Sequence, residues 1–230
     1  MEPTDVLYCL ERTGAMLRND HFVYASGLHG DTYIEKKMLY TDAPTMALLC
    51  EQMARRVLDF GRITCVVGPE KGGIILAQWV GYFLNEVSEY RVASVFAEKG
   101  DGSFPYSSEL NFVFNGGYGD LVRGVDVLLV DDVVNTGGSL RALAYRVRQC
   151  EGNIVGAVAI CNRGGVHAYE ADVPRLVSLA DIFLPSYHAD QCPLCASGIP
   201  VNREYGRGRQ FVQQGVLDAI AQWRPGTLEL

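Results

Sequence analysis

Apolar residues gather in short runs along the middle of the chain, and longer segments of helical composition follow two of these runs. Val127 to Val130 are all aliphatic, without alternation, which is the pattern of a central parallel strand covered on both faces. The repeated order of strand and helix predicts an α/β fold, a parallel twisted sheet flanked by helices. The expected strands are residues 63–67, 91–97, 125–130 and 154–161, and the expected helices between them are 73–87 and 138–150.

The flanks of this core have a different composition. Asp42 and Pro44 predict the start of a helix, and Gly61 predicts its end after Phe60. Residues 26–40 are polar and aromatic, with several glycines, and are more typical of a hood than of a core element. The long stretch 100–119 has glycines at both ends, and we expect a mobile hairpin that closes over a substrate.

Size and composition exclude several classes of protein. A chain of 230 residues, 48% of them hydrophobic, fits one α/β domain with appended ends. The net charge of −7 argues against a nucleic-acid partner, which needs a basic surface. No apolar run approaches the length of about 18 residues that spans a membrane, so we expect no membrane partner. Seven scattered cysteines, an odd number, favour the reducing cytoplasm.

Two adjacent acids follow the aliphatic run at the carboxyl end of its strand, where α/β proteins bind ligands. Asp131 and Asp132 offer only acceptors, which suits sugar hydroxyls or a metal ion that carries a phosphate. The turn after them supplies hydroxyls and open backbone N–H groups at a helix start, which suits a phosphate. Its residues are Asn135, Thr136, Gly137, Gly138 and Ser139. The alternative is an ordinary helix start capped by Asp and Asn. The spacings of a P-loop and of a dinucleotide fingerprint are both absent.

A second glycine-containing loop follows the first core strand and leads into a helix. It contains Gly68, Glu70, Lys71, Gly72 and Gly73. Its position at the same edge of the sheet makes it a second candidate anion loop, and the alternative is a tight turn.

The run 127–139 resembles the phosphoribosyl-diphosphate (PRPP) motif of type I phosphoribosyltransferases, which has four apolar residues, two acids, two apolar residues and a small-residue turn. The resemblance implies that Asp131 and Asp132 hold the ribose 2′- and 3′-hydroxyls. It further implies that Asn135 to Ser139 grip the 5′-phosphate, and that the loop 68–73 cradles pyrophosphate.

Three other segments resemble the orotate branch of this family. Residues 26–37 are similar to its hood, with Tyr33 and Lys37 at matching positions, and Arg163 matches an arginine that faces the base carboxylate. Residues 192–200 match a C-terminal C-P-x-C-x-x-G-[IV]-P tail. The sequence departs from the pattern at Ala25, at Gly30 and in the loop after Lys99, where a further lysine and a histidine are missing.

The resemblance implies transfer of the phosphoribosyl group from PRPP to a nucleobase, with orotate as the expected acceptor. Mg²⁺ is expected as the cofactor, carried by PRPP without direct protein ligands, and a homodimer is expected. Lys71, Lys99 and Lys37 would stabilise pyrophosphate, and Arg163 and Tyr33 would hold the base. A purine or other acceptor and a non-catalytic PRPP-binding regulator remain as alternatives.

The expected organisation is one phosphoribosyltransferase domain over residues 1–230. Residues 1–41 would form an N-terminal helix and hood, 42–180 the core, and 181–230 a C-terminal tail and helix.

Cys192 and Cys195 form a single C-x-x-C pair in the expected tail. A tetrahedral zinc site needs four ligands; His188 could be a third, and no second C-x-x-C pair is present. A structural tail, a zinc site and a redox pair therefore all remain open.

Overall fold

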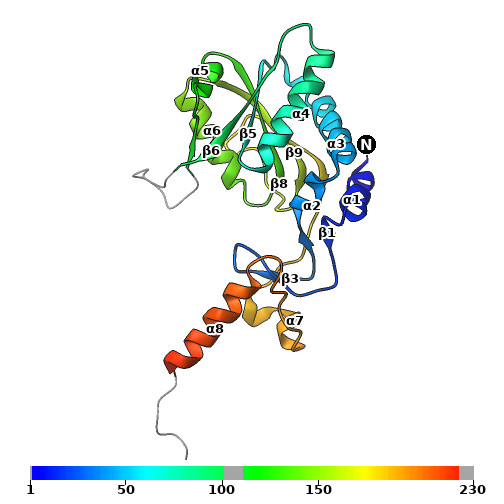
Figure 1. Ribbon diagram of the computed structural model, residues 1–230, viewed down its shortest axis with the longest axis vertical. Helices are drawn as coiled ribbons and strands as arrows, with labels where there is room; N and C mark the ends of the chain where they lie inside the picture. The colour runs from blue at the N-terminus through cyan, green and yellow to red at the C-terminus, as the bar shows by residue number, and fades with distance from the viewer. Residues whose placement is uncertain (1, 101–110, 223–230) are drawn as a thin grey trace, which may run out of the picture. The chain divides into compact units, whose positions relative to one another are not determined.

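The computed structural model describes residues 2–100 and 111–222, and the chain falls into two compact units (Figure 1). The first unit comprises Met1–Thr13 and Lys36–Phe183, and the second comprises Gly14–Glu35 and Leu184–Leu230. Each unit is therefore built from two separate stretches of the chain.

The first unit contains a six-stranded sheet of order β10-β9-β8-β5-β6-β7. Its strands are β5 (Cys65–Pro69), β6 (Ala93–Lys99), β7 (Phe112–Val113), β8 (Asp126–Val134), β9 (Asn153–Asn162) and β10 (Leu176–Asp181). All neighbouring pairs are parallel except β6 and β7. The aliphatic residues 127–130 of β8 are completely buried, as predicted for a central strand. The predicted α/β fold with a mostly parallel sheet is confirmed.

Helices cover both faces of this sheet (Figure 1). They are α1 (Pro3–Arg12), α2 (Lys36–Tyr40), α3 (Ala43–Arg56), α4 (Gly72–Val87), α5 (Tyr118–Val122) and α6 (Gly138–Gln149). Leu140 and Leu143 of α6 share a buried cluster with Val127 and Leu129 of β8. On the other face α3 packs on α4, and Gly81 of α4 lies so close to Ser94 of β6 that a side chain would not fit.

The predicted start of α3 is confirmed, because the Asp42 carboxylate accepts a hydrogen bond of 3.0 Å from the Thr45 N–H. The predicted end at Phe60 is wrong for the α-helix, which stops at Arg56. A 3₁₀ turn over Leu58–Phe60 follows it, because the N–H of Val57 already bonds to the carbonyl three residues back. Gly61 then leaves this turn with φ of 92°.

The base of the predicted hairpin after β6 is an antiparallel pair in which Lys99 faces Phe112. The Gly100 N–H donates to the Asn111 carbonyl at 2.9 Å. The tip, residues 101–110, lies outside the described residues, so closure over a substrate stays a prediction. β7 supplies the returning strand of the predicted hairpin, and the short helix α5 follows it, which the sequence did not predict.

The second unit has short elements. Two antiparallel ribbons pair β1 (Met16–Leu17) with β4 (Tyr33–Ile34) and β2 (Phe22–Val23) with β3 (His29–Gly30). The C-terminal stretch adds η2 (Ala189–Gln191), α7 (Pro193–Ala196) and α8 (Gly208–Gln222). Across the described parts of both units, no helix combines the length and apolar character needed to cross a membrane.

Candidate active site

The predicted order of strand, acid pair, turn and helix is present at the end of β8. The strand continues four residues beyond the predicted limit, because its parallel neighbour β9 keeps pairing up to Val134 and Asn162. Asp131 and Asp132 therefore lie inside the last part of the strand, and these residues are 7% and 2% exposed. Gly137 has φ of 74° and precedes the first residue of α6.

The turn between β8 and α6 is short, and most of its residues are accessible to solvent. Asn135 and Thr136 are exposed, and Ser139 is half-buried in the first turn of α6. The Gly138 N–H lies 3.4 Å from the Thr136 hydroxyl. The first N–H groups of a helix have no partner within the helix, and its dipole attracts negative charge. Together these groups have the composition of a phosphate site.

Asp132 is held by two side chains of α2. The Lys36 ammonium lies 2.7 Å from Oδ1, and the Tyr40 hydroxyl donates to Oδ2. The sequence did not predict either contact. It singled out the neighbouring Lys37, an exposed residue, as a cation of the site. A signal was present, because Lys36 and Tyr40 are four residues apart and share one face of a helix.

The Asp131 carboxyl has a pKa well above the usual value for an aspartate. Burial raises the pKa of Asp131 to about 7, and the adjacent Asp132 charge adds to this rise, while Lys36 and the Asp132 N–H oppose it. The Asp132 N–H donates to Asp131 Oδ1 at 2.9 Å. Near neutral pH this carboxyl therefore titrates, and groups that donate to it or carry positive charge favour its ionised form.

The second predicted loop, residues 68–73, lies against the acid pair. A Cβ on Gly72 would collide with Asp132 Oδ2 and the Tyr40 hydroxyl, and a Cβ on Gly68 would collide with the Gly73 carbonyl. Glycine at position 72 thus allows the start of α4 to reach Asp132. The structure therefore brings the loop 68–73 to Asp132, at the edge of the sheet where the sequence predicted both glycine-containing loops.

The predicted cations of this region lie at the ends of strands or helices. Lys71 precedes α4 and Lys99 ends β6, and both side chains are exposed. Glu70 is half-buried, with its N–H bonded to the Ala97 carbonyl at 2.9 Å. Since β5, β6 and β8 are parallel, the residues after them meet at one edge of the sheet.

Arg163 follows β9 at the same edge. Its N–H donates to the Val134 carbonyl at 2.8 Å, and a Cβ on the next residue, Gly164, would collide with the Asn135 carbonyl. The loop that carries Arg163 therefore lies against the turn after β8. Tyr33 belongs to the second unit, where its ring contacts the rings of Phe22 and Tyr205 at centroid distances of 5.5 and 6.2 Å.

Comparison with known proteins identifies a family and several similar chains. The phosphoribosyl transferase domain family matches residues 39–180. The chain is 32% identical over 202 residues to the orotate phosphoribosyltransferase of Caulobacter vibrioides, which covers 87% of this chain and 95% of the relative.

Two solved structures with a similar fold come from enzymes with different bases in their names. Orotate phosphoribosyltransferase from Aeropyrum pernix is 23% identical, with a TM-score of 0.55 over 76% of this chain and 93% of that one. Adenine phosphoribosyltransferase from Thermoanaerobacter pseudethanolicus is 20% identical, with a TM-score of 0.56 over 75% of this chain and 99% of that one. The fold alone therefore does not distinguish between the two bases.

Proposed function

The chain belongs to the phosphoribosyl transferase domain family, and from this premise we propose that it transfers the 5-phosphoribosyl group of PRPP to orotate. The products would be orotidine 5′-phosphate and pyrophosphate, in pyrimidine nucleotide synthesis. The observation that carries the proposal is the buried acid pair of Asp131 and Asp132 at the end of β8, with Gly72 of the second glycine-containing loop against Asp132. Orotate is favoured because the curated relatives similar over most of the chain carry that name.

We propose that the two acids hold the ribose ring. Carboxylates accept hydrogen bonds from neighbouring hydroxyls, and a rigid pair at the end of a buried strand fixes the direction of the ring. The turn Asn135, Thr136, Gly137, Gly138 and Ser139 would bind the 5′-phosphate through its N–H and hydroxyl groups.

Pyrophosphate would leave toward the loop of Glu70, Lys71, Gly72 and Gly73. Lys71, Lys99 and Lys37 are proposed to stabilise its growing negative charge, and the long side chains of these exposed lysines can carry their ammonium groups to it. Mg²⁺ bound to PRPP would neutralise part of the diphosphate charge. Asp131 and Asp132 fit this arrangement as acceptors near the ribose, and we propose no direct contact between Mg²⁺ and the protein.

The reaction would displace pyrophosphate from the anomeric carbon while positive charge develops on the ribose. Ionised Asp131 and Asp132 would stabilise that charge from below the ring. Arg163 and Tyr33 are proposed to hold the base, since the fork of an arginine binds a planar carboxylate such as that of orotate with two hydrogen bonds. Closure of the hairpin after Lys99 would exclude water and limit hydrolysis of PRPP.

Pyrophosphate release provides the test. Protein, Mg²⁺ and PRPP are mixed with orotate, with adenine, with other bases or with no base. Release that requires orotate supports the proposal. Release with another base assigns that acceptor instead, and PRPP binding without turnover on any base assigns a regulator. The double substitution Asp131→Asn with Asp132→Asn should abolish turnover, and unchanged turnover would refute the proposed ribose site.

We also propose a homodimer and a cytoplasmic location. A groove of about 240 Å³ between α3 and α4 is lined by Leu58, Tyr82 and Val87, which are 54%, 50% and 56% exposed, and a second copy could cover these apolar side chains. None of the seven cysteines forms a disulfide, which suits a reducing compartment. Analytical ultracentrifugation should give the mass of a dimer, and a fully active monomer would contradict this part of the proposal.

A further inference from the structure

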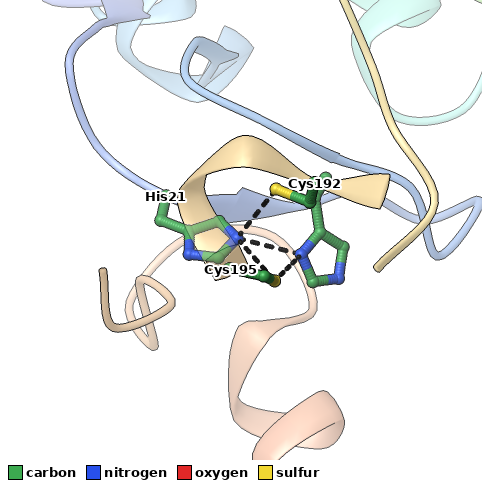
Figure 2. Close-up of side chains that lie close together, drawn as sticks. His21, Cys192 and Cys195 are labelled. Carbon is green, nitrogen blue, oxygen red and sulfur yellow. Dashed lines mark hydrogen bonds between the residues drawn. The ribbon is translucent and has the colours of Figure 1, made fainter. Parts of the chain in front are cut away.

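Four potential metal ligands from distant parts of the sequence meet in the second unit. His21, His29, Cys192 and Cys195 place one ligand atom each within 4.8 Å of all the others. Figure 2 shows the side chains of His21, Cys192 and Cys195 pointing toward one another. No other group of three or more such residues occurs in the described parts of the chain.

The distances between the ligand atoms fit a tetrahedral zinc ion. Zinc bonds of about 2.3 Å to sulfur and about 2.05 Å to nitrogen require N···S separations of about 3.6 Å and an N···N separation of about 3.3 Å. His21 Nε2 lies 3.6 Å from both sulfur atoms, and His29 Nδ1 lies 3.3 Å from the Cys195 sulfur. The two histidine nitrogens are 2.9 Å apart, so a small outward shift would complete the tetrahedron.

The surroundings prepare His21 for this role. Its other ring nitrogen, Nδ1, lies 2.7 Å from the Ile199 carbonyl, which accepts a hydrogen bond and therefore fixes the proton on Nδ1. The lone pair of Nε2 then points into the cluster. This arrangement, a metal-binding imidazole with its second nitrogen bonded to a carbonyl, is typical of protein metal sites.

The two ring nitrogens of His29 have different surroundings. Its side chain is completely buried, and its Nε2 has no hydrogen-bond partner among the described residues. The ring stands edge-on to Phe211, with centroids 4.8 Å apart. The opposite ring nitrogen, Nδ1, faces the cluster, 2.9 Å from His21 Nε2 and 3.3 Å from the Cys195 sulfur, and is the atom that a metal ion between these ligands would bind.

The alternatives weighed for Cys192 and Cys195 give a poorer account of this cluster. A redox pair requires two cysteines and access for a partner, yet Cys192 is 2% exposed and two histidine nitrogens face the sulfur atoms. His188 is exposed and is not part of the group. We propose that His21, His29, Cys192 and Cys195 bind one structural Zn²⁺ ion.

The proposed ion would hold the second unit together. His21 directly precedes β2, and His29 is the first residue of β3. Cys192 precedes α7 and Cys195 lies within it, more than 160 residues further along the chain. The unit has only two-stranded ribbons and short helices, and such small units commonly depend on a metal for stability. All four protein ligands fill the tetrahedron, so no open position remains for catalysis.

Metal analysis tests the proposal directly. The full chain, expressed with zinc and purified under reducing conditions, should contain one zinc per chain by mass spectrometry of the metals. Replacement with Co²⁺ should give the intense visible bands of tetrahedral cobalt together with thiolate charge-transfer bands. His29→Asn and Cys195→Ser should bring the zinc content near zero, whereas His188→Gln and Cys150→Ser should leave it at one per chain.

Chelation of the wild-type protein avoids any dependence on folding of the variants. A strong chelator should release one zinc and expose residues 184–222 to limited proteolysis, while the sheet of the first unit stays protected. A chain without zinc that also gives no tetrahedral cobalt spectrum, or a disulfide between Cys192 and Cys195 in the reduced preparation, would overturn the proposal. None of these measurements requires turnover, so the result is independent of the proposed transferase activity.

Discussion

Asp131→Asn should stabilise the fold while it abolishes phosphoribosyl transfer. The wild-type carboxyl has its pKa raised from 3.8 to about 7, chiefly by burial and then by the adjacent Asp132 charge. Each pKa unit corresponds to about 1.36 kcal/mol, so ionising Asp131 in the folded protein costs up to about 4 kcal/mol. Asparagine has the same shape and cannot ionise, and its carbonyl can still accept the Asp132 N–H.

The sign of the pH dependence follows from the proton count. Between about pH 4 and pH 7 the folded chain keeps a proton on Asp131 that the unfolded chain has already lost, so wild-type stability falls as the pH rises. The contribution is fully present below pH 4 and lost as the pH passes about 7. The stability of Asp131→Asn relative to wild type should therefore increase from pH 4 to pH 7 and level off above about pH 8.

Urea unfolding followed by circular dichroism measures this difference at pH 5, 6, 7 and 8, with zinc kept constant. Asp126→Asn is a matched control at the other end of the same strand, where the side chain is only partly buried and its carboxylate accepts from the Asn153 amide. This control should show no comparable gain. A stability difference for Asp131→Asn that stays flat from pH 5 to pH 8 would refute the reasoning about the buried carboxyl.

Three further perturbations address the same region. Gly72→Ala should reduce kcat/KM at least 100-fold and destabilise the fold by about 1–3 kcal/mol, because the new Cβ collides with Asp132 and Tyr40. Enzyme kinetics and urea unfolding measure the two effects. Gly119→Ala is the control, because the nearest atom to its new Cβ is 3.5 Å away. Lys36→Gln should raise the pKa of Asp131 further, because the lysine charge lowers it, and the titration of a ¹³C-labelled carboxyl measures this shift. Mg²⁺–PRPP at 100 times its Kd should stabilise wild type by about 2.7 kcal/mol in thermal unfolding and leave Asp131→Asn with Asp132→Asn unchanged.

The sequence predicted the parts of the fold that depend on local pattern. We could predict the buried strand β8, its acid pair and the turn into α6. An unbroken aliphatic run indicates a buried strand, and glycines before a helix indicate a turn, so both follow from the local sequence. Strand limits were less accurate, since β8 continues through its acids only because β9 offers partners on that side.

Contacts between distant segments were not readable in the same way. The pairing of Lys36 with Asp132 joins residues 96 positions apart, and adjacent lysines at 36 and 37 look equivalent until the helix is placed. The same limit applies to the metal cluster. The C-x-x-C pair was visible, but its two histidine partners lie more than 160 residues away and carry no local pattern of a ligand.

The two acids of the candidate site are adjacent in sequence and yet differ in what they can do. Asp132 accepts from Lys36, from Tyr40 and from the Val133 N–H, so most of the roughly four acceptor positions of its carboxylate are already in use. Asp131 accepts one described hydrogen bond, from the Asp132 N–H, and retains capacity for a ligand. A sugar hydroxyl that donates to Asp131 favours its ionised form, whereas the Asp132 carboxylate is already held in place by Lys36 and Tyr40 of α2. Asp132 thus sets the geometry and the field of the pair, and Asp131 is the member whose charge responds to the ligand.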